Sequence, residues 1–514
     1  MINAYDEVPY SAAAHAQTHP ENLRLIAVLL GLDPIAARIA RVLEIGCANG
    51  TNLFPMAEAY PDAHFVGLDY SQKQIDQAEN YKQALGINNI EFHALDVVAI
   101  PKAISSNLGQ FDYIICHGVF SWVEESVRLA ILHMIRNHLS SNGVAFLSYN
   151  CYPGWKVREI ARDMMLYHGN QFTEPGQRYK QARAMAEFVH ENHNGENDVY
   201  GKLLEDSLNI IKSSAPDYVM HEYLEVINHP FYFNEVCDLA KNEGLAYLGD
   251  GNIPEMFAYG LSKKTEDALN QVARNDYEKR EQYLDFLRNR MFRNSLFVHS
   301  GSAIQRQISI DLAQTMFFTA NCRPSKDKSK EAAYETPTGQ TLNAHTPLIV
   351  WLLDTLIASS PRFMSYEAIL RLAKEKFDID KTALQSQLSE ALLRLISMSG
   401  VHARLDDLPM PVPAVKPNYP FAPHFSRLVA KANETVPSLL HGNVKLSVLQ
   451  RIILQKATGK CTVNAIVDDV ETLFKAGQLK WNKPDGSVAI PEKEAIQDMV
   501  KLGISELRDL SLLY

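Results

Sequence analysis

Residues 38–152 alternate short apolar runs with segments of helical periodicity. The apolar runs lie at 41–46, 64–69, 90–96, 111–117 and 144–149. Helical patterns at 51–60, 72–85 and 125–139 follow three of these runs, with turns between. Strands that alternate with helices in this way predict a parallel sheet covered by helices on both faces. The expected fold class is therefore α/β, a Rossmann-like doubly wound sheet.

The pattern changes after Pro153 and Gly154, where helical periodicity alone continues to residue 212. Alternation of strand and helix then resumes. We therefore expect an all-helical insertion that interrupts the sheet domain and serves either as a dimerisation lobe or as a packing elaboration. The segments concerned are helices at 155–167, 177–193 and 233–242, and strand-like runs at 219–226 and 245–248.

Two polar, proline-containing segments separate the remaining chain into helix-rich modules. Residues 322–336 are polar and basic, and residues 408–423 hold six prolines, a composition typical of extended, exposed linkers. A long charged helix is expected at 266–297. The predicted domains are a ligand-binding core (1–154), the helical insertion (155–215), the remainder of the core (216–300), a middle helix-rich domain (301–407) and a winged-helix-like domain (424–514).

Composition narrows the class of protein. Of 514 residues, 46% are hydrophobic and 21% are charged, which excludes a disordered, collagen-like or transmembrane chain. The net charge of −10 provides no long-range attraction for nucleic acid. The six cysteines form no CxxC pair and no cluster with histidines, so no metal site is expected. The N-terminal segment has no signal-peptide pattern, and no apolar run reaches the ~20 residues that a membrane span needs. We expect a cytoplasmic protein without membrane insertion.

The loop after the first predicted strand carries the strongest chemical signal. Residues 42–51 read Val-Leu-Glu-Ile-Gly-Cys-Ala-Asn-Gly-Thr. Gly46 and Gly50 let the backbone approach a nucleotide-like ligand closely, and Cys47 lies between them. The loop is not the GxGxxG phosphate fingerprint, and it has an acid, Glu44, two residues before the first glycine. An acid there fits a ligand with a cationic amino group rather than a pyrophosphate.

Two further acids end the second and third predicted strands. Asp69 can accept hydrogen bonds from both hydroxyls of a ribose, and Asp96 can accept one from an adenine amino group. Tyr70 and Val97 follow these acids and belong to the same expected site. Three acids at successive strand ends, without a phosphate-binding lysine, predict an adenosine ligand that carries no phosphate. S-adenosyl-L-methionine meets this description.

The order of these residues resembles that of class I S-adenosylmethionine-dependent methyltransferases, with Ala48 where many of them have glycine. A narrower resemblance is to methyltransferases that carry a methyltransferase regulatory domain. That family includes bacterial protein-lysine methyltransferases that act on outer-membrane proteins. The resemblance implies S-adenosylmethionine as cofactor and lysine side chains of a protein, including an outer-membrane protein, as acceptors. The segments that carry it are 5–10, 18–20, 118–122, 148–155, 221–224, 230–233 and 285–293, and beyond residue 300 only Gly339, 346–347 and 439–442.

Candidate catalytic residues lie beyond the fourth and fifth strands, where this type of sheet places its reactive centre. They are His117, which is also a candidate cofactor contact, Trp122 and Tyr149. An aromatic face can hold a sulfonium or a lysine side chain, although Trp122 fits a core position equally well. The acceptor lysine must lose its proton, and His117 or a rim tyrosine could relay it. Tyr5 and His19 lie in an N-terminal arm that either covers the cofactor as a lid or packs on the core.

The expected function is methyl transfer from S-adenosylmethionine to lysine side chains of a protein. Two alternatives stay open: a small-molecule methyltransferase, and a non-catalytic regulatory protein that binds S-adenosylmethionine. The multi-module tail favours a large substrate, because a small molecule needs no such surface. The helical insertion favours a homodimer. The proline-rich linker predicts few contacts across it, so removal of residues 424–514 is expected to leave cofactor affinity nearly intact.

Overall fold

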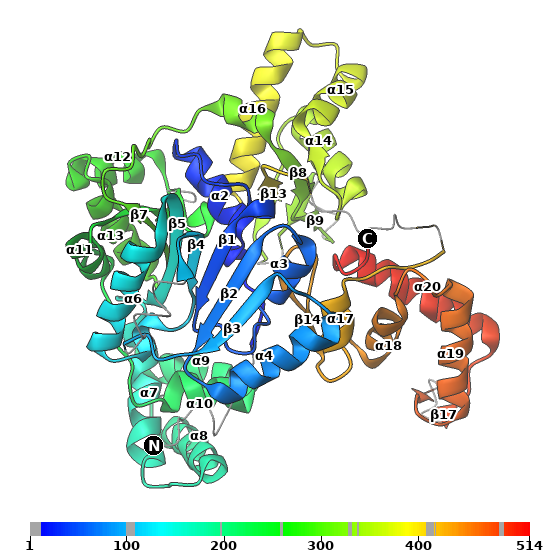
Figure 1. Cartoon of the computed structure of the whole chain (residues 1–514), viewed down its shortest axis with the longest axis horizontal. Coiled ribbons are helices and arrows are strands. Elements are labelled where there is room, and N and C mark those ends of the chain that lie inside the picture. Colours follow the sequence, from blue (N-terminus) through cyan, green and yellow to red (C-terminus); the bar gives the residue numbers. More distant parts are fainter. Residues whose placement is uncertain are drawn as a thin grey trace.

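The computed structural model describes residues 12–98, 108–195, 198–257, 261–326, 332–336, 339–407, 416, 418–482 and 488–514. Figure 1 shows a central sheet between layers of helices, a helical lobe below it and a second helical domain above it. The C-terminal domain, in orange and red, lies beside the sheet domain. Within the described residues, no helix combines the length and the apolar character needed to cross a membrane.

Seven strands form the central sheet: β1 (Arg41–Ile45), β2 (His64–Asp69), β3 (Ile90–Ala94), β4 (Phe111–Cys116), β5 (Leu139–Asn150), β6 (Leu245–Asp250) and β7 (Phe292–His299). Their order is β3-β2-β1-β4-β5-β7-β6. The first five strands pair in parallel, whereas β7 is antiparallel to both of its neighbours. The Rossmann-like α/β class is confirmed, with a mixed rather than a wholly parallel sheet.

Helices cover both faces of this sheet because its strands are apolar on each side. On one face, called here the α2 face, lie α2 (Pro20–Leu29), α3 (Phe54–Ala59) and α4 (Gln72–Leu85). On the other, the α6 face, lie α6 (Glu125–His138) and α11 (Phe233–Asn242). Along β5, Phe146 belongs to the core of the α2 face and Leu147 to that of the α6 face. Because side chains alternate between the two faces of a strand, neighbouring residues of β5 contact different cores.

Two sequence predictions in the second half of the sheet domain are wrong. Segment 219–226 is not a strand, because residues Pro216–Leu224 form the helix α10. Its proline occupies the first turn, and a short apolar run does not distinguish a strand from a buried helix. Segment 266–297 is not one helix. It contains α12 (Lys263–Ala273), α13 (Tyr277–Arg288) and the start of β7.

The helical insertion has a small core of its own. It consists of α7 (Trp155–Gly169), α8 (Pro175–Asn192), α9 (Val199–Ser213) and α10. These helices pack around Met165, Ala182, Leu208 and Tyr223. Figure 1 shows this lobe at the lower end of the molecule, below the sheet.

The middle domain combines three helices with short strands. Its helices are α14 (Pro347–Ser359), α15 (Tyr366–Lys376) and α16 (Lys381–Ser397). The small sheets are β12 (Met364–Ser365), β8 (Phe317–Ala320) and β13 (Val401–Arg404), and β11 (Thr341–Asn343), β10 (Ala333–Glu335) and β9 (Arg323–Pro324). Segment 322–336, expected as an exposed loop, thus contributes strands where it is described, and Tyr334 is buried with its hydroxyl donating to Asp354 at 2.8 Å.

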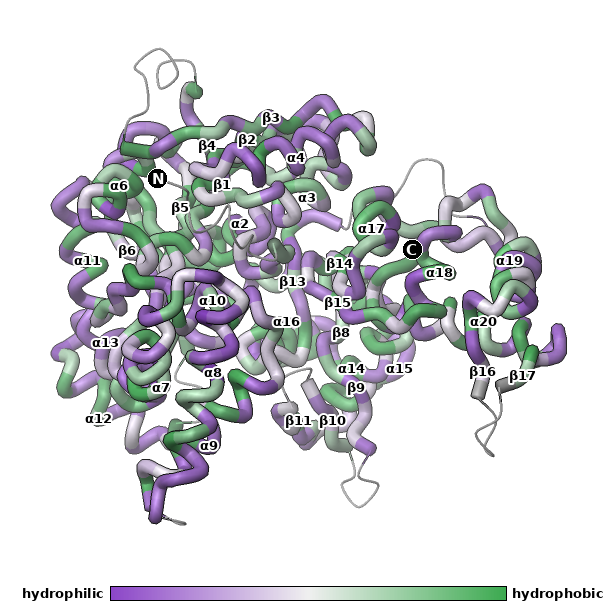
Figure 2. The backbone as a smooth tube through the Cα atoms, turned by 90° about the horizontal axis from the view of Figure 1, so that it is seen from below, coloured by the Kyte–Doolittle hydropathy of each residue, from purple (hydrophilic) through white to green (hydrophobic). Residues whose placement is uncertain are grey.

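The C-terminal domain contains α17 (His424–Val429), β14 (Thr435–Pro437), β15 (Asn443–Lys445), α18 (Val448–Lys456), α19 (Val463–Lys475), β16 (Trp481–Asn482), β17 (Val488–Ala489) and α20 (Lys493–Asp509). Figure 2 shows α17 and β14 next to the sheet domain and α19 far from it. The expected linker at 408–415 and 417 lies outside the described residues.

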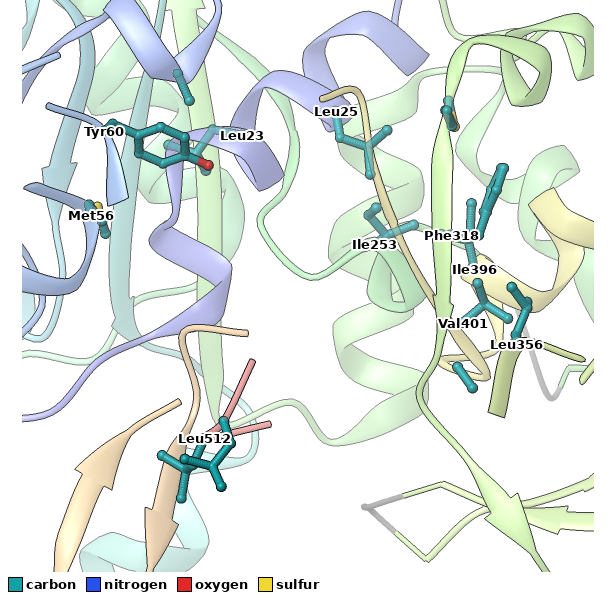
Figure 3. Close-up of a cluster of buried hydrophobic side chains, with 14 of the residues drawn as sticks. Leu23, Leu25, Met56, Tyr60, Ile253, Phe318, Leu356, Ile396, Val401 and Leu512 are labelled. Carbon is teal, nitrogen blue, oxygen red and sulfur yellow. The ribbon is translucent and has the colours of Figure 1, made fainter. Parts of the chain in front are cut away.

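The sheet domain, the middle domain and the C-terminal domain share one apolar core. The proline-rich segment had instead suggested few contacts between the C-terminal domain and the rest of the chain. In Figure 3, Leu23 and Leu25 of α2, Met56 of α3, Phe318 of the middle domain and Leu512 near the C-terminus belong to the same cluster. The helix α17 is tied to α3 directly. The ring of Phe425 stacks on that of Phe54 with centroids 5.0 Å apart. The Glu58 carboxylate accepts the backbone N–H groups of His424 and Phe425.

Candidate functional site

The loop after β1 is a tight turn with three residues in the left-handed region. Gly46, Ala48 and Gly50 have φ values of +76°, +47° and +77°. A Cβ atom at Gly46 would lie 2.4 Å from Val119 Cγ2, so a side chain does not fit there. Ala48 carries a side chain in a backbone conformation that favours glycine. The turn brings bare backbone to the carboxyl edge of the sheet.

Asp69, at the end of β2, fixes this turn. Its Oδ2 accepts the N–H of Ala48 at 2.8 Å, and its Oδ1 accepts the N–H of Ser71 at 2.9 Å. The carboxylate therefore bridges the loops that follow β1 and β2. Because each carboxylate oxygen can accept more than one hydrogen bond, this role is compatible with the ribose contact expected of Asp69. Burial, together with Asp69 and Glu44, raises the pKa of the Cys47 thiol, which lies inside the turn.

The remaining expected contacts of the adenosine part lie on the outer side of the strand ends. The Tyr70 side chain is 67% exposed. Asp96 is exposed two residues beyond β3, and its Oδ1 accepts the N–H of Val98 at 2.9 Å. Val97 packs partly on the core of the α6 face. This side is thus open, whereas Glu44 and Cys47 are enclosed.

Glu44 is a buried carboxylate at the carboxyl end of β1. It is 4% exposed, and its Oε1 accepts the Nδ2–H of Asn52 at 2.7 Å. Among the described residues its Oε2 is buried without any hydrogen-bond partner. Burial raises the pKa of Glu44 to about 8, with Asp69 adding to the effect and the Asn52 hydrogen bond opposing it. A buried carboxylate oxygen without a donor fits a ligand that brings an ammonium group to this position.

Asn52 joins Glu44 to two distant parts of the chain. Its Oδ1 accepts the backbone N–H of His15 and lies 2.9 Å from His441 Nε2, in the loop between β14 and β15. Its Nδ2 also donates to Thr18 Oγ1 at 3.0 Å. The N-terminal arm and the C-terminal domain therefore both reach the Glu44 site through one buried amide.

The N-terminal arm lies between the sheet domain and the C-terminal domain. His19 precedes α2, and its Nδ1 accepts the N–H of Glu21 at 3.1 Å. Its ring meets that of His441 edge-on, with centroids 5.1 Å apart. Burial, with His441 and Arg404, lowers the pKa of His19 well below its usual value. The expected contact Tyr5 lies outside the described residues.

His117 follows β4 and belongs to an aromatic stack. Its ring lies parallel to that of His15 with centroids 3.9 Å apart, and Phe146 and Phe292 lie 5.8 and 6.0 Å away. Gln17 Nε2 lies 3.4 Å from His117 Nε2. Burial, with a contribution from His15, lowers the pKa of His117 well below its usual value. The ring is therefore neutral at physiological pH.

The other two candidate catalytic residues have different surroundings. Trp122, in the turn Phe120–Trp122, is half-buried and meets Trp155 edge-on at 6.1 Å. Tyr149 is 1% exposed in the core of the α6 face, on the opposite side of the sheet from Phe146, and its hydroxyl bonds to Ser295 Oγ at 2.9 Å. Its position does not favour contact with reacting groups.

Sequence reasoning missed several residues that the fold brings to this site. Asn52 bonds to Glu44, and His15 and His441 both bond to Asn52. Phe292, at the start of β7, contacts His117. The only signal for His441 was the short block 439–442. Asn150, the last residue of β5, is 2% exposed, and its Nδ2 has no partner within the described part of the chain.

The chain matches three family models of known proteins. One family model, described as a methyltransferase domain, matches residues 38–207. A second, described as a predicted methyltransferase regulatory domain, matches residues 215–299, and a third, the PKMT C-terminal winged helix domain, matches residues 418–511. The chain therefore belongs to the methyltransferases that carry a regulatory domain and a PKMT (protein lysine methyltransferase) winged helix domain.

Individual relatives extend this result. Two uncharacterized proteins of Rickettsia prowazekii are 40% and 35% identical to this chain over 324 and 245 residues. The alignments cover 63% and 48% of this chain, and 58% and 96% of those proteins. The structure of PKMT2 from Rickettsia typhi in complex with AdoHcy has a TM-score of 0.85 at 27% identity, covering 98% of this chain and 100% of that chain. The expected methyltransferase class and the winged-helix-like C-terminal module are confirmed.

Proposed function

We propose that this protein transfers methyl groups from S-adenosylmethionine to lysine side chains of a protein. The observation that carries the proposal is the buried Glu44 carboxylate beside the glycine turn, with one oxygen that lacks a donor in the described structure. PKMT2 of Rickettsia typhi, which matches along nearly the whole chain, is described in complex with AdoHcy. AdoHcy is the product that S-adenosylmethionine leaves after methyl transfer, and it supports the same cofactor here.

The residues around the turn suit this cofactor by charge and by shape. We assign Glu44 to the amino group, Asp69 to the ribose hydroxyls and Asp96 to the adenine amino group. The turn itself depends on Gly46 and Gly50, because Val119 lies where a Cβ atom of Gly46 would be and Phe92 where that of Gly50 would be. When bound, the cofactor supplies an activated methyl group on a sulfonium.

The aromatic stack at His117 suits the acceptor. Transfer to an amine requires in-line positioning, exclusion of water and a neutral nitrogen. A lysine side chain that packs beside His117 and Phe292 loses solvent, which lowers its pKa and favours the neutral amine. Because burial lowers the pKa of His117 itself, its role is to orient the amine rather than to store a proton. Trp122 is the second candidate wall of this site.

We propose that the acceptor is a protein, including an outer-membrane protein, and that the transfer takes place in the cytoplasm. The middle and C-terminal domains offer a surface that a small acceptor would not need. A small-molecule methyltransferase would use the same cofactor site but label no protein. A regulatory protein would bind the cofactor without turnover.

We also propose a homodimer formed through the helical lobe. Tyr167, Phe188 and Val199 of this lobe are 79%, 59% and 79% exposed, and exposed apolar side chains gathered on one lobe are typical of an interface. A dimer by sedimentation at micromolar concentration is the expected result. A monomer at that concentration would rule the proposal out.

Transfer of a labelled methyl group tests the function directly. The purified protein is incubated with labelled S-adenosylmethionine and cell-envelope proteins, and the labelled lysines are identified by mass spectrometry. Asp69→Ala serves as the variant without cofactor binding. Label on protein lysines with the wild type alone is the expected outcome. Label only on small molecules would favour the small-molecule alternative, and binding without any transfer would favour the regulatory one.

A further inference from the structure

Three segments far apart in the sequence meet at one buried side chain, Asn52. It is 4% exposed, and its amide contacts Glu44 of β1, the arm residues His15 and Thr18, and His441 of the C-terminal domain. His441 lies 389 positions further along the chain. Its side chain is also 4% exposed, so this contact is not a surface encounter.

The neighbours of Asn52 determine which way its amide points. The backbone N–H of His15 can only donate, so the atom that it meets at 2.9 Å is the carbonyl oxygen Oδ1. The amide nitrogen therefore faces Glu44 Oε1 at 2.7 Å and Thr18 Oγ1 at 3.0 Å. With Oδ1 as acceptor, His441 must carry its proton on Nε2 and donate it. The amide then uses both of its donors, and its oxygen accepts from His15 and His441, with Thr18 Oγ1 also 3.3 Å away.

The loop that carries His441 is built to reach this point. It connects β14 to β15, and His441 is held at φ +60°, a conformation unfavourable for a residue with a side chain. Ser438 accepts the N–H of His441 through its carbonyl at 3.0 Å and donates its own N–H to Gly442 at 2.7 Å. Next to it, Asn443 exchanges two hydrogen bonds with the backbone of Ala14 in the arm. The loop and the arm are thus fixed to each other beside Asn52.

We propose that His441 of the winged helix domain is a positioning residue of the cofactor site, which holds Asn52 so that its amide donates to Glu44. The inference rests on the proposed function, in which Glu44 receives the amino group of the cofactor. In this proposal the C-terminal domain supplies one residue that supports the cofactor site. His441 itself does not touch the reacting atoms.

This arrangement has a consequence for the pH dependence of binding. Glu44 attracts an ammonium group only in its ionised form, and the Asn52 hydrogen bond favours that form against burial and Asp69. Cys47 and Cys116 also face Glu44, and both stay neutral because burial raises the pKa of each thiol. Loss of the His441 contact leaves Asn52 Oδ1 held by the His15 N–H. The amide is then held less firmly, its hydrogen bond to Glu44 weakens, and the pH at which Glu44 ionises moves upward.

The histidines around His441, and His441 itself, do not titrate in the same range. His15, His19 and Arg404 face His441 from the arm and from β13, and burial with His15 and Arg404 lowers the pKa of His441 to about 3. Burial lowers the pKa of His15 to about 4. These histidines therefore do not titrate above pH 6.5. A difference between the His441→Ala and wild-type profiles in that range is due to Glu44, because the ammonium group of the ligand titrates in the same way with both proteins.

Calorimetric titration with S-adenosylhomocysteine between pH 6.5 and 9 tests the proposal on the full-length protein. We expect His441→Ala to bind roughly 3- to 10-fold more weakly near pH 7 and to recover affinity at a higher pH than the wild type. His441→Gln, whose amide can still donate, should restore part of the affinity. His133→Ala serves as the matched control, because His133 lies on the exposed side of α6, where its side chain is 67% exposed. An unchanged affinity and pH profile for His441→Ala would overturn the proposal.

Two further variants separate positioning from general damage. Asn52→Asp keeps an acceptor for His15 and His441 but has no N–H for Glu44, so it should move the pH profile upward even with the C-terminal domain in place. In a Glu44→Gln background, His441→Ala should cause no further loss, because its effect passes through Glu44. Fully additive losses would contradict the proposal. A wild type that does not bind S-adenosylhomocysteine would instead overturn the proposed function itself.

Discussion

Several single residues of the site have a burial or a backbone conformation that is unfavourable for their type. Glu44 is a carboxylate without solvent, and Ala48 and His441 have left-handed backbone conformations. The structure around them holds each state in place. Asn52 donates to Glu44 and accepts from His441, and Asp69 accepts the N–H of Ala48. The cofactor would therefore bind to groups that are already held in place.

The first prediction concerns Glu44 and the pH dependence of stability. Burial raises its pKa to about 8, whereas the unfolded value is about 4.3. Between these values the folded, cofactor-free protein holds a proton that the unfolded chain releases, so this group makes stability fall as pH rises through that window. Glu44→Gln should remove that contribution. Urea unfolding at pH 6 and pH 8 measures the difference, and an identical pH dependence in both proteins would refute it.

A second prediction concerns Ala48, where the turn tolerates a residue with a Cβ atom at φ +47°. Glycine adopts this conformation without steric cost, although it loses more entropy on folding. Ala48→Gly should therefore raise the free energy of unfolding by about 0.5–1 kcal/mol and keep cofactor affinity within a small factor. Chemical denaturation of both proteins provides the measurement. A destabilised variant would mean that the methyl group of Ala48 contributes packing that outweighs the strain.

At the scale of elements, sequence patterns were informative wherever the pattern was local. The five parallel strands and the helices between them follow from apolar runs and caps, such as the Ser71 side chain, which accepts the N–H of Gln74, and the left-handed Gly86 that ends α4. The helix α10 and the strand β7 were misjudged because short apolar runs are ambiguous. β7 also pairs with β5, more than 140 positions earlier, which no local pattern records.

The third prediction concerns the buried charges that hold β7. Arg293 is fully buried, donates to Asp285 at 2.8 Å and lies 3.3 Å from Glu281, with its guanidinium over the Phe233 ring. Arg293→Met leaves these carboxylates buried with less compensation, which should lower the free energy of unfolding by about 3–5 kcal/mol. Arg183→Met is the control, because the Arg183–Glu187 pair on α8 is about one-third exposed. Equal unfolding midpoints for the two variants in urea would contradict this role.

In the whole molecule, the domains are not separate units, because they share an apolar core and the contacts around Asn52. The sequence identified Glu44, Asp69 and the glycine turn because they lie close together in the chain, between residues 44 and 69 and around two strands. It could not identify Asn52, His15 and His441 as partners, because only the folded chain brings residues 15, 52 and 441 together. Because of these contacts, we no longer expect removal of the C-terminal domain to leave cofactor affinity intact.

The fourth prediction replaces the one made from the proline-rich segment. Removal of residues 424–514 deletes the Phe425 contact with Phe54, the α17 groups that Glu58 accepts, and the His441 contact with Asn52. We expect the shortened protein to bind S-adenosylhomocysteine at least 10-fold more weakly and to expose the apolar surface of α3. Calorimetry and binding of a hydrophobic dye measure the two effects. Full cofactor affinity in a folded, shortened protein would show that the domain does not support the site.

In the proposed site, the buried carboxylate of Glu44 receives the α-amino group of the cofactor. Calorimetry of Glu44→Gln with two ligands tests it: S-adenosylhomocysteine, which has the α-amino group, and 5′-methylthioadenosine, which keeps the adenosine part, with its adenine amine, but has no α-amino group. A charge-assisted hydrogen bond contributes about 1.5–3 kcal/mol, so the variant should bind S-adenosylhomocysteine roughly 10- to 150-fold more weakly and 5′-methylthioadenosine as the wild type does. Equal losses for both ligands, or no loss for S-adenosylhomocysteine, would contradict the claim.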